Sequence, residues 1–273
     1  MKTPLLGLAT VVRSGCPCFV AGTPVWTDKG LVPIEKIQVG DMLLSKSETT
    51  GEKAFKRVLR TFRTEDQELC TFCAEGTTNE DGSELLVEFL FATPSHLIWV
   101  NGQGWMTLGE LYDPGQRYVI DNWTFERADG RKSIFFAEYE ALGAPVLSLS
   151  DAENPTFVCI GSNSAIGDGT IGYTMRFDGK TQLDGFDPFV YADRSTSNTR
   201  VAFHGATFTG DDLDDLNRLK GPVRNFKTTV FNIEVEEFRT YFVGELGLWV
   251  HNTCSSLACD LLSDPSFTTD AVR

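Results

Sequence analysis

Short apolar runs broken by turn residues extend along most of the chain. Segments such as Leu85–Ala92 and Thr240–Val243 combine aliphatic, β-branched and aromatic residues, which favour β-strands. Gly, Asp-Gly and Pro-Gly signals close these runs after a few residues, too soon for long helices. The pattern predicts a mainly β protein whose clearest strands are at residues 24–27, 42–46, 57–64, 69–74, 85–92, 96–100, 118–121, 228–234, 240–243 and 248–250.

Helical periodicity covers only single turns, at residues 33–37, 108–112 and 211–219. The region 124–220 has a different composition, because it is rich in Gly, Ser, Thr, Asn and Asp. It still contains aromatic strand patterns at residues 173–177 and 201–208, which a disordered linker would lack. We therefore expect a β-rich insertion there. Its acidic residues lack the alternating ligand spacing of a calcium loop and favour a solvated helix start at Gly210-Asp211.

A faint internal repeat relates residues 32–44 to residues 106–119. In each copy a glycine precedes one helical turn with apolar residues three apart, and a glycine turn and a strand follow. Ile34 in the first copy corresponds to Leu108 in the second. Two similar β units in tandem predict a duplicated, pseudo-symmetric fold.

Length and charge narrow the function classes. The chain has 273 residues, 41% of them hydrophobic, which is enough for a sizeable core in one or two domains. Its formal net charge of -14 disfavours nucleic acid and anionic lipid as partners. No apolar run approaches a membrane span, and the apolar stretch 4–12 contains Pro4 and Gly7 and lacks a clear cleavage site. The location is left open, with cytoplasmic synthesis expected and export as part of a larger secreted protein compatible with the sequence.

Seven cysteines are an odd number, which argues against a pure disulfide framework. Cys70 and Cys73 form a lone CxxC, and no second CxxC completes a zinc pattern. Two buried thiols on a strand are favoured over a metal or redox site. We expect no metal and no organic cofactor.

Three separated segments carry the candidate chemistry. The first is Cys18-Phe-Val-Ala-Gly-Thr-Pro-Val, and the second is Thr93-Pro-Ser-His96. The third runs from Val-Phe-Asn-Ile-Glu-Val at residues 230–235 to His251-Asn252, which Thr253 follows. In this order the segments resemble the Hint (Hedgehog/intein) autoprocessing family, and most of all the intein-like Hint domains of bacterial secreted and polymorphic-toxin proteins.

The resemblance implies a Hint-type, pseudo-two-fold horseshoe β fold with a β-rich insertion. The implied divisions are an N-terminal flank (1–17), a Hint domain in two pieces (18–123 and 221–252), an insertion subdomain (124–220) and a C-terminal flank (253–273). The flanks would be the substrate, and the family analogy adds a downstream toxin cargo. No nucleic acid or membrane span is implied.

The family's first step would use Cys18 as nucleophile. Cysteine is the best protein nucleophile at neutral pH, and its sulfur can reach the carbonyl carbon of Pro17, giving a thioester by an N–S acyl shift. By resemblance His96 contacts and protonates the scissile amide nitrogen, which suits a pKa near 7, and Thr93 orients this contact by hydrogen bonding.

The second step would be cyclisation of Asn252, whose side-chain amide attacks its own backbone carbonyl and breaks the bond to Thr253. By resemblance His251 donates to the departing group. The Thr253 hydroxyl would take up the acyl group from Cys18 if splicing is complete. The third histidine, His204, lies in the insertion and is assigned no catalytic part.

Three departures from the family pattern bear on the outcome. Arg239 stands where the family often has a histidine, and an arginine cannot shuttle protons. Pro17 precedes the nucleophile, and Thr253 is a weaker acceptor than Cys or Ser. We therefore expect cleavage rather than efficient splicing, with cleavage at Asn252–Thr253 slightly ahead.

Two other functions remain open at this point. One is a catalytically degenerate Hint fold that binds a partner through its insertion. The other is a cysteine hydrolase that acts in trans with Cys18 and His96, which would need an open cleft that the sequence does not indicate.

Overall fold

The computed structural model describes residues 17–111, 123–135, 146–148, 156–163, 169–184, 199–211 and 224–252. This part of the chain is mainly β, as predicted. The first strands are β1 (Phe19–Val20), β2 (Pro24–Thr27), β3 (Gly30–Pro33), β4 (Met42–Lys46), β5 (Lys53–Glu68), β6 (Cys70–Thr77), β7 (Leu85–Ala92), β8 (Leu97–Val100), β9 (Gly104–Thr107), β10 (Thr124–Glu126) and β11 (Lys132–Phe135). They are followed by β12 (Val146–Ser148), β13 (Thr156–Asn163), β14 (Gly169–Arg176), β15 (Gln182–Asp184), β16 (Thr199–Phe203), β17 (Thr207–Asp211), β18 (Arg224–Asn225), β19 (Lys227–Val235), β20 (Thr240–Val243) and β21 (Leu248–His251).

Among the described residues only two short helical turns interrupt the strands. They are the 3-10 turn η1 (Ile34–Lys36) and the single α-helical turn α1 (Leu108–Leu111). Both coincide with predicted turns. No helix among the described residues is long and apolar enough to cross a membrane.

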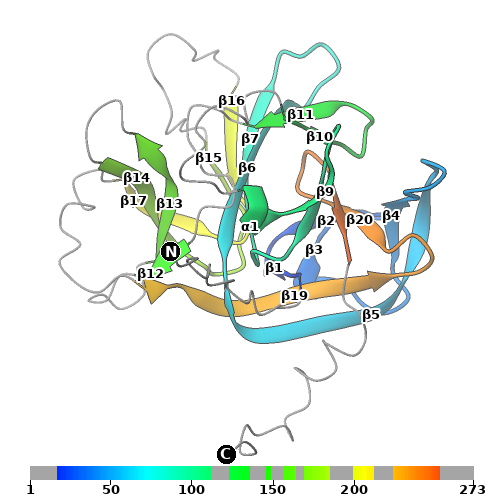
Figure 1. Ribbon diagram of the computed structural model, residues 1–273, viewed down its shortest axis with the longest axis horizontal. Helices are drawn as coiled ribbons and strands as arrows, with labels where there is room; N and C mark the ends of the chain where they lie inside the picture. The colour runs from blue at the N-terminus through cyan, green and yellow to red at the C-terminus, as the bar shows by residue number, and fades with distance from the viewer. Residues whose placement is uncertain are drawn as a thin grey trace, which may run out of the picture.

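The strands form two sheets. The larger follows the order β1-β19-β5-β4-β2-β20-β21-β8-β10-β11-β6-β7-β16-β15, with β3 on β2, β9 on β8, and an additional pairing between β1 and β7. The smaller follows the order β17-β14-β13-β12-β18. Figure 1 shows β5 and β19 as two long neighbouring strands along one side of the molecule, with the small sheet near the end where β19 begins.

The short strand β1 holds the Cys18 segment between two distant parts of the chain. Phe19 pairs with Phe231 of β19 and with Ala92 of β7. Because β7 ends at Ala92, the residue after Phe19's partner is Thr93. The first and second sequence segments therefore lie side by side, and the third begins on the other side of β1.

The end of the third segment reaches the same region through another pairing. β20 and β21 form a hairpin in which Thr240 pairs with His251. β21 pairs in turn with β8, where His251 faces Leu97. Because His96 immediately precedes Leu97, this register brings the two histidines to neighbouring positions.

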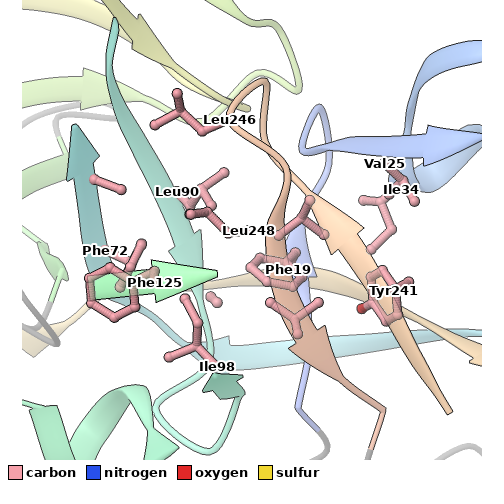
Figure 2. Close-up of a cluster of buried hydrophobic side chains, with 14 of the residues drawn as sticks. Phe19, Val25, Ile34, Phe72, Leu90, Ile98, Phe125, Tyr241, Leu246 and Leu248 are labelled. Carbon is pink, nitrogen blue, oxygen red and sulfur yellow. The ribbon is translucent and has the colours of Figure 1, made fainter. Parts of the chain in front are cut away.

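Within the described part of the chain, the larger of two clusters of buried apolar side chains packs between these strands. It includes Phe19, Phe72, Leu90, Ile98 and Leu248 from five different strands. Figure 2 shows these side chains converging, with Tyr241 at one side of the cluster. Apolar burial across strands from both ends of the chain stabilises their closure.

The predicted repeat is visible as two similar units. In the first, the β2–β3 hairpin leads to η1, and in the second the β8–β9 hairpin leads to α1. Ile34 of η1 and Leu108 of α1 are both buried in the large cluster. The predicted correspondence thus holds for the hairpin and the buried helical turn, while the strand predicted to follow in the second copy lies outside the described residues.

Two predictions about local structure were wrong. Residues 201–208 are not one strand, because β16 ends at Phe203 and β17 begins at Thr207, with Gly205 between them at φ 86°. Asp211 does not start a helix, since it pairs with Tyr173 at the end of β17. The rest of the predicted helix, like the predicted strand 118–121, lies outside the described residues.

The division into Hint pieces and an insertion stays a prediction. Strands β10 and β11, on the insertion side of residue 124, pair with β8 and β6 in the large sheet. β16 pairs with β7 in parallel, and β12, β13, β14 and β17 belong to the small sheet. The described part of the insertion is therefore shared between the two sheets.

Candidate active site

Cys18 and Thr93 are joined through their main chains and the Thr93 hydroxyl. The Cys18 N–H donates to Thr93 Oγ1 at 3.0 Å, and the Thr93 N–H donates to the Cys18 carbonyl at 2.9 Å. Both residues are buried, as is Pro17. The amide between Pro17 and Cys18 is therefore fixed in place, and its N–H is hydrogen-bonded to a hydroxyl oxygen.

The Cys18 thiol lies in an apolar environment. Burial raises its pKa to about 12, and a hydrogen bond with the Thr64 side chain opposes that rise only in part. Thr64 lies on β5, opposite Val230 of β19. In this conformation the thiol is protonated at neutral pH, and any attack requires a base or a change in its surroundings.

His96 is completely buried beside Phe19, with 4.0 Å between the ring centroids. The main-chain N–H of His96 donates to the Thr93 carbonyl at 3.0 Å, so Thr93 connects His96 to Cys18. Neither ring nitrogen has a hydrogen-bond partner within the described residues. The predicted contact of His96 with the scissile amide nitrogen is therefore not made, because Thr93 Oγ1 accepts that N–H instead. Burial, with the charge of His251 second, lowers its pKa to about 3. The expected pKa near 7 was wrong, because desolvation disfavours the charged ring.

Asn252 is buried and held by a second asparagine. Its side-chain Oδ1 accepts a hydrogen bond from Asn232 Nδ2 at 3.3 Å. Asn232 Oδ1 in turn accepts from Tyr241 Oη at 3.2 Å and from the Ile233 N–H at 2.7 Å. This network fixes Asn232 and gives the Asn252 side chain a defined orientation.

The two ends of the candidate site are electrostatically connected through Tyr241. Burial raises the pKa of Tyr241 well above its usual range, and the Cys18 thiol contributes in the same direction. Since Tyr241 donates to Asn232, it lies between the cysteine and the asparagine network. The fold thus brings residues 18 and 252 into one buried region.

His251 is only partly buried and bonds to an acidic residue. Its Nε2 lies 2.9 Å from Glu48 Oε1, and its ring packs edge-on against Trp105 with centroids 5.1 Å apart. Burial lowers its pKa, while Glu48 and the Asn252 backbone favour the charged ring. His251 is therefore more easily protonated than His96.

Arg239 contributes through its backbone. It has a positive φ of 54°, and its carbonyl accepts the Asn252 N–H at 2.8 Å. The side chain is exposed, and its charge opposes protonation of His251. Thr253 lies outside the described residues.

The CxxC pair does not form a single two-thiol site. Cys70 belongs to the large apolar cluster and Cys73 to a second one, as the alternating faces of a strand require. Burial raises the pKa of both thiols, and both are free. No group of three or more His, Cys, Asp or Glu side chains within the described ranges could hold a metal.

The sequence analysis gave no role to Asn232, Tyr241 or Glu48, although Asn232 lies within the third segment. Asn232 had a detectable signal, because it occupies the same strand face as Val230, and a polar residue at an inward position is unusual. Glu48 gave no local signal, since its contact depends on tertiary structure.

Comparison with known proteins finds similarity among solved inteins. A bacterial intein-like domain from Clostridium thermocellum is 20% identical, with 86% of this chain and 98% of that chain covered and a TM-score of 0.43. A DnaB intein from Synechocystis sp. PCC 6803 is 11% identical, with 87% and 99% covered and a TM-score of 0.39. The gp41-1 intein is 12% identical, with 87% and 100% covered and a TM-score of 0.38.

No family model and no curated protein matches the chain. At these identities the likeness assigns no residue of this chain a role.

Proposed function

We propose that this protein is an intein-like autoprocessing domain that breaks peptide bonds in its own chain. The observation that carries the proposal is the hydrogen bond from the Cys18 amide to Thr93 Oγ1, in the same buried region as the fixed side chain of Asn252. The proposed nucleophile and the proposed cyclising amide are far apart in the sequence and are linked there through Tyr241 and Asn232. Each proposed step is intramolecular, because Cys18 attacks the carbonyl carbon of the preceding residue and Asn252 attacks its own.

The first step is an N–S acyl shift at Pro17–Cys18. Cys18 Sγ bonds to the Pro17 carbonyl carbon, and the bond from that carbon to the Cys18 nitrogen breaks. The thiol proton ends on that nitrogen, so the step is balanced without any co-reactant. His96 is neutral at physiological pH because burial lowers its pKa to about 3. It can carry this proton only after a change in its surroundings raises that pKa towards the working pH.

Thr93 has a defined part in this step. Its hydroxyl oxygen accepts from the scissile N–H in the resting state, which holds the nitrogen in place while the carbonyl is attacked. When the nitrogen becomes an amine, the same hydroxyl still bonds to it. Thr93 thus keeps the nitrogen in place from the attack on the carbonyl until the nitrogen leaves as an amine.

The second step is cyclisation of Asn252. Its Nδ2 bonds to its own carbonyl carbon, the bond to the Thr253 nitrogen breaks, and one Nδ2 proton passes to that nitrogen. The hydrogen bond from Asn232 to Oδ1 leaves Nδ2 as the attacking group and orients it. The substrate is the flanking polypeptide, and by the same proposal a downstream cargo would be released here.

Cleavage is favoured over splicing, with the Asn252–Thr253 bond ahead. The Cys18 thiol starts from a pKa of about 12, which makes the first step slow in the resting conformation. A secondary alcohol such as that of Thr253 is a weak acyl acceptor. Asn252 cyclisation depends on neither group.

The proposal is tested by intact mass of the purified chain over time at neutral pH. We expect loss of residues 253–273, abolished by Asn252→Ala but not by Cys18→Ala. Retention of the tail in the unmutated chain would contradict the proposal for this bond. A joined peptide of the two flanks would show splicing instead.

A second candidate function is a catalytically inactive Hint-like module that binds a partner. The observation in its favour is the burial of Cys18, whose thiol is far less acidic than an active nucleophile requires. A full-length mass that stays unchanged after long incubation, with and without added thiol, would favour this function.

A further inference from the structure

Glu48 contacts the histidine that precedes the cyclising asparagine. It lies in the turn between β4 and β5, and its Oε1 is 2.9 Å from His251 Nε2. The two residues are about two hundred positions apart, so only the fold joins them. The His251 side chain is 17% exposed and that of Glu48 is 38% exposed, which places the contact at the edge of the buried site.

The contact is built on a rigid frame. Ser45 Oγ donates to the Thr240 carbonyl at 2.6 Å, and Thr240 Oγ1 donates to the Lys46 carbonyl at 2.6 Å. Thr240 is also the strand partner of His251. The end of β4, which lies two residues before Glu48 in the sequence, is therefore fixed relative to His251.

The turn that carries Glu48 has its own support. The Ser47 N–H donates to the Glu52 carbonyl at 2.8 Å, and the Gly51 N–H donates to the Ser47 carbonyl at 2.9 Å. The Thr50 N–H donates to Ser47 Oγ at 3.2 Å. Glu48 thus approaches His251 from a closed turn, so the backbone that carries it is already ordered when the contact is made.

The carboxylate fixes the state of the imidazole ring. A carboxylate only accepts hydrogen bonds, so Nε2 carries the proton and Nδ1 of the neutral ring carries the lone pair. Nδ1 is buried and has no hydrogen-bond partner within the part of the chain that the structure describes. The Nδ1 lone pair therefore stands one residue before Asn252, whose backbone favours protonation of the ring.

Other charged groups act on the same ring. Arg239 disfavours its protonation, and the charge of His251 is in turn felt by His96. Glu48 is the acidic side chain that bonds to the ring and favours its charged form. Its effect on the pKa of His251 is opposite to that of Arg239.

We propose that Glu48 is a positioning residue for asparagine cyclisation, holding His251 in the tautomer and orientation in which Nδ1 accepts a proton from Asn252 Nδ2. This inference rests on the proposed function. As the new bond from Nδ2 to the carbonyl carbon forms, His251 passes the proton to the Thr253 nitrogen, whose bond to that carbon breaks. Glu48 stays ionised and nothing is oxidised or reduced.

The test uses the full chain with Cys18→Ala, which isolates cleavage at Asn252–Thr253. The rate of tail loss is measured by intact mass from pH 6 to 9 for Glu48→Gln, Glu48→Ala and the control Glu52→Gln. Glu52 is exposed in the same turn, so its variant removes an equal charge without touching His251. We expect Glu48→Gln to slow cleavage about tenfold, Glu48→Ala to slow it further, and Glu52→Gln to leave it unchanged.

The pH profile adds a readout that a purely structural role would not move. Because Glu48 favours the charged ring, Glu48→Gln should shift the acidic limb of the profile to lower pH. NMR titration of His251 in the uncleavable Cys18→Ala, Asn252→Ala chain should show the same shift. It also tests the contact without any cleavage.

The outcomes separate this inference from the function on which it rests. If Cys18→Ala cleaves and Glu48→Gln cleaves at the same rate with the same profile, Glu48 has no positioning role and autoprocessing stands. If Cys18→Ala keeps its tail at every pH, autoprocessing at this bond fails and the inference falls with it.

Discussion

Glu88 and His204 form a fully buried pair, with His204 Nε2 3.0 Å from Glu88 Oε2. Glu88 comes from β7, and His204 from the turn after β16, within the predicted insertion. The same carboxylate accepts the Glu245 N–H at 2.8 Å and the Leu246 N–H at 3.3 Å. The pair therefore ties the insertion and the β20–β21 turn to the strand that leads to Thr93.

We predict that His204→Ala lowers the free energy of unfolding by about 3–5 kcal/mol, because it leaves the Glu88 carboxylate buried with fewer partners. The double variant Glu88→Gln, His204→Gln should lose less than the sum of its single variants. Urea denaturation in the Cys18→Ala, Asn252→Ala background measures both effects. A loss below about 1 kcal/mol for His204→Ala would contradict the assignment of a buried, coupled pair.

Thr93→Val should slow the N-terminal step by about tenfold or more, because the scissile amide loses its acceptor while the side-chain shape is kept. Thr93→Ser should restore most of the rate. The measurement is thiol-induced release of residues 1–17 from the Asn252→Ala chain, followed by mass.

A matched control for this variant lies on the neighbouring strand. Thr71 is buried on β6, and its hydroxyl has no hydrogen-bond partner within the described residues. Thr71→Val makes the same chemical change and should leave the release rate unaltered. Equal slowing by Thr71→Val and Thr93→Val would mean that packing, not the amide contact, controls the step.

Asn232→Ala should slow C-terminal cleavage roughly fivefold, the factor expected from one hydrogen bond worth about 1 kcal/mol. The reason is the loss of the contact from Asn232 Nδ2 to Asn252 Oδ1. Tail loss from Cys18→Ala chains measures the effect, and thiol-induced release of residues 1–17 should change little. An unaltered tail-loss rate would show that Asn252 needs no such orientation.

The burial of His96 gives a pH dependence of stability. Its pKa is about 3 in the fold against 6.5 as the ordinary value, so below pH 6.5 the unfolded chain binds a proton that the folded chain does not. This contribution to stability is present above pH 6.5 and is lost as the pH falls towards 3, by about 1.4 kcal/mol per unit.

Urea denaturation at pH 6.5 and 5.0 tests this dependence in the Cys18→Ala, Asn252→Ala background. His96→Gln should lose about 2 kcal/mol less stability between the two pH values than the chain that keeps His96. If both chains lost the same stability between the two pH values, His96 would have the same pKa in the folded and unfolded states.

Much of the fold could be predicted from local sequence. The strands at 24–27, 42–46, 85–92 and 240–243 agree with the structure at both ends, because turn residues bound compact apolar runs there. The strand predicted at 57–64 extends over Lys53–Glu68. Its polar ends are held by pairing with β4 and β19, which no local pattern reveals.

The candidate site was only partly predictable for the same reason. Thr93 and Asn252 belong to motifs whose order along the chain points to one region. Asn232 could have been found as a polar residue on an inward strand face. Glu48 could not, because its contact with His251 is set by the link between Ser45 and Thr240.

The most direct test of autoprocessing is the mass of the Asn252→Ala chain incubated at neutral pH with an excess of small thiol. Formation of a thioester at Cys18 predicts release of residues 1–17 as the thiol adduct, leaving a fragment that begins at Cys18. Cys18→Ala should abolish the release. A full-length mass that persists with thiol, in a chain that is folded by circular dichroism, would contradict the proposed acyl shift at Pro17–Cys18.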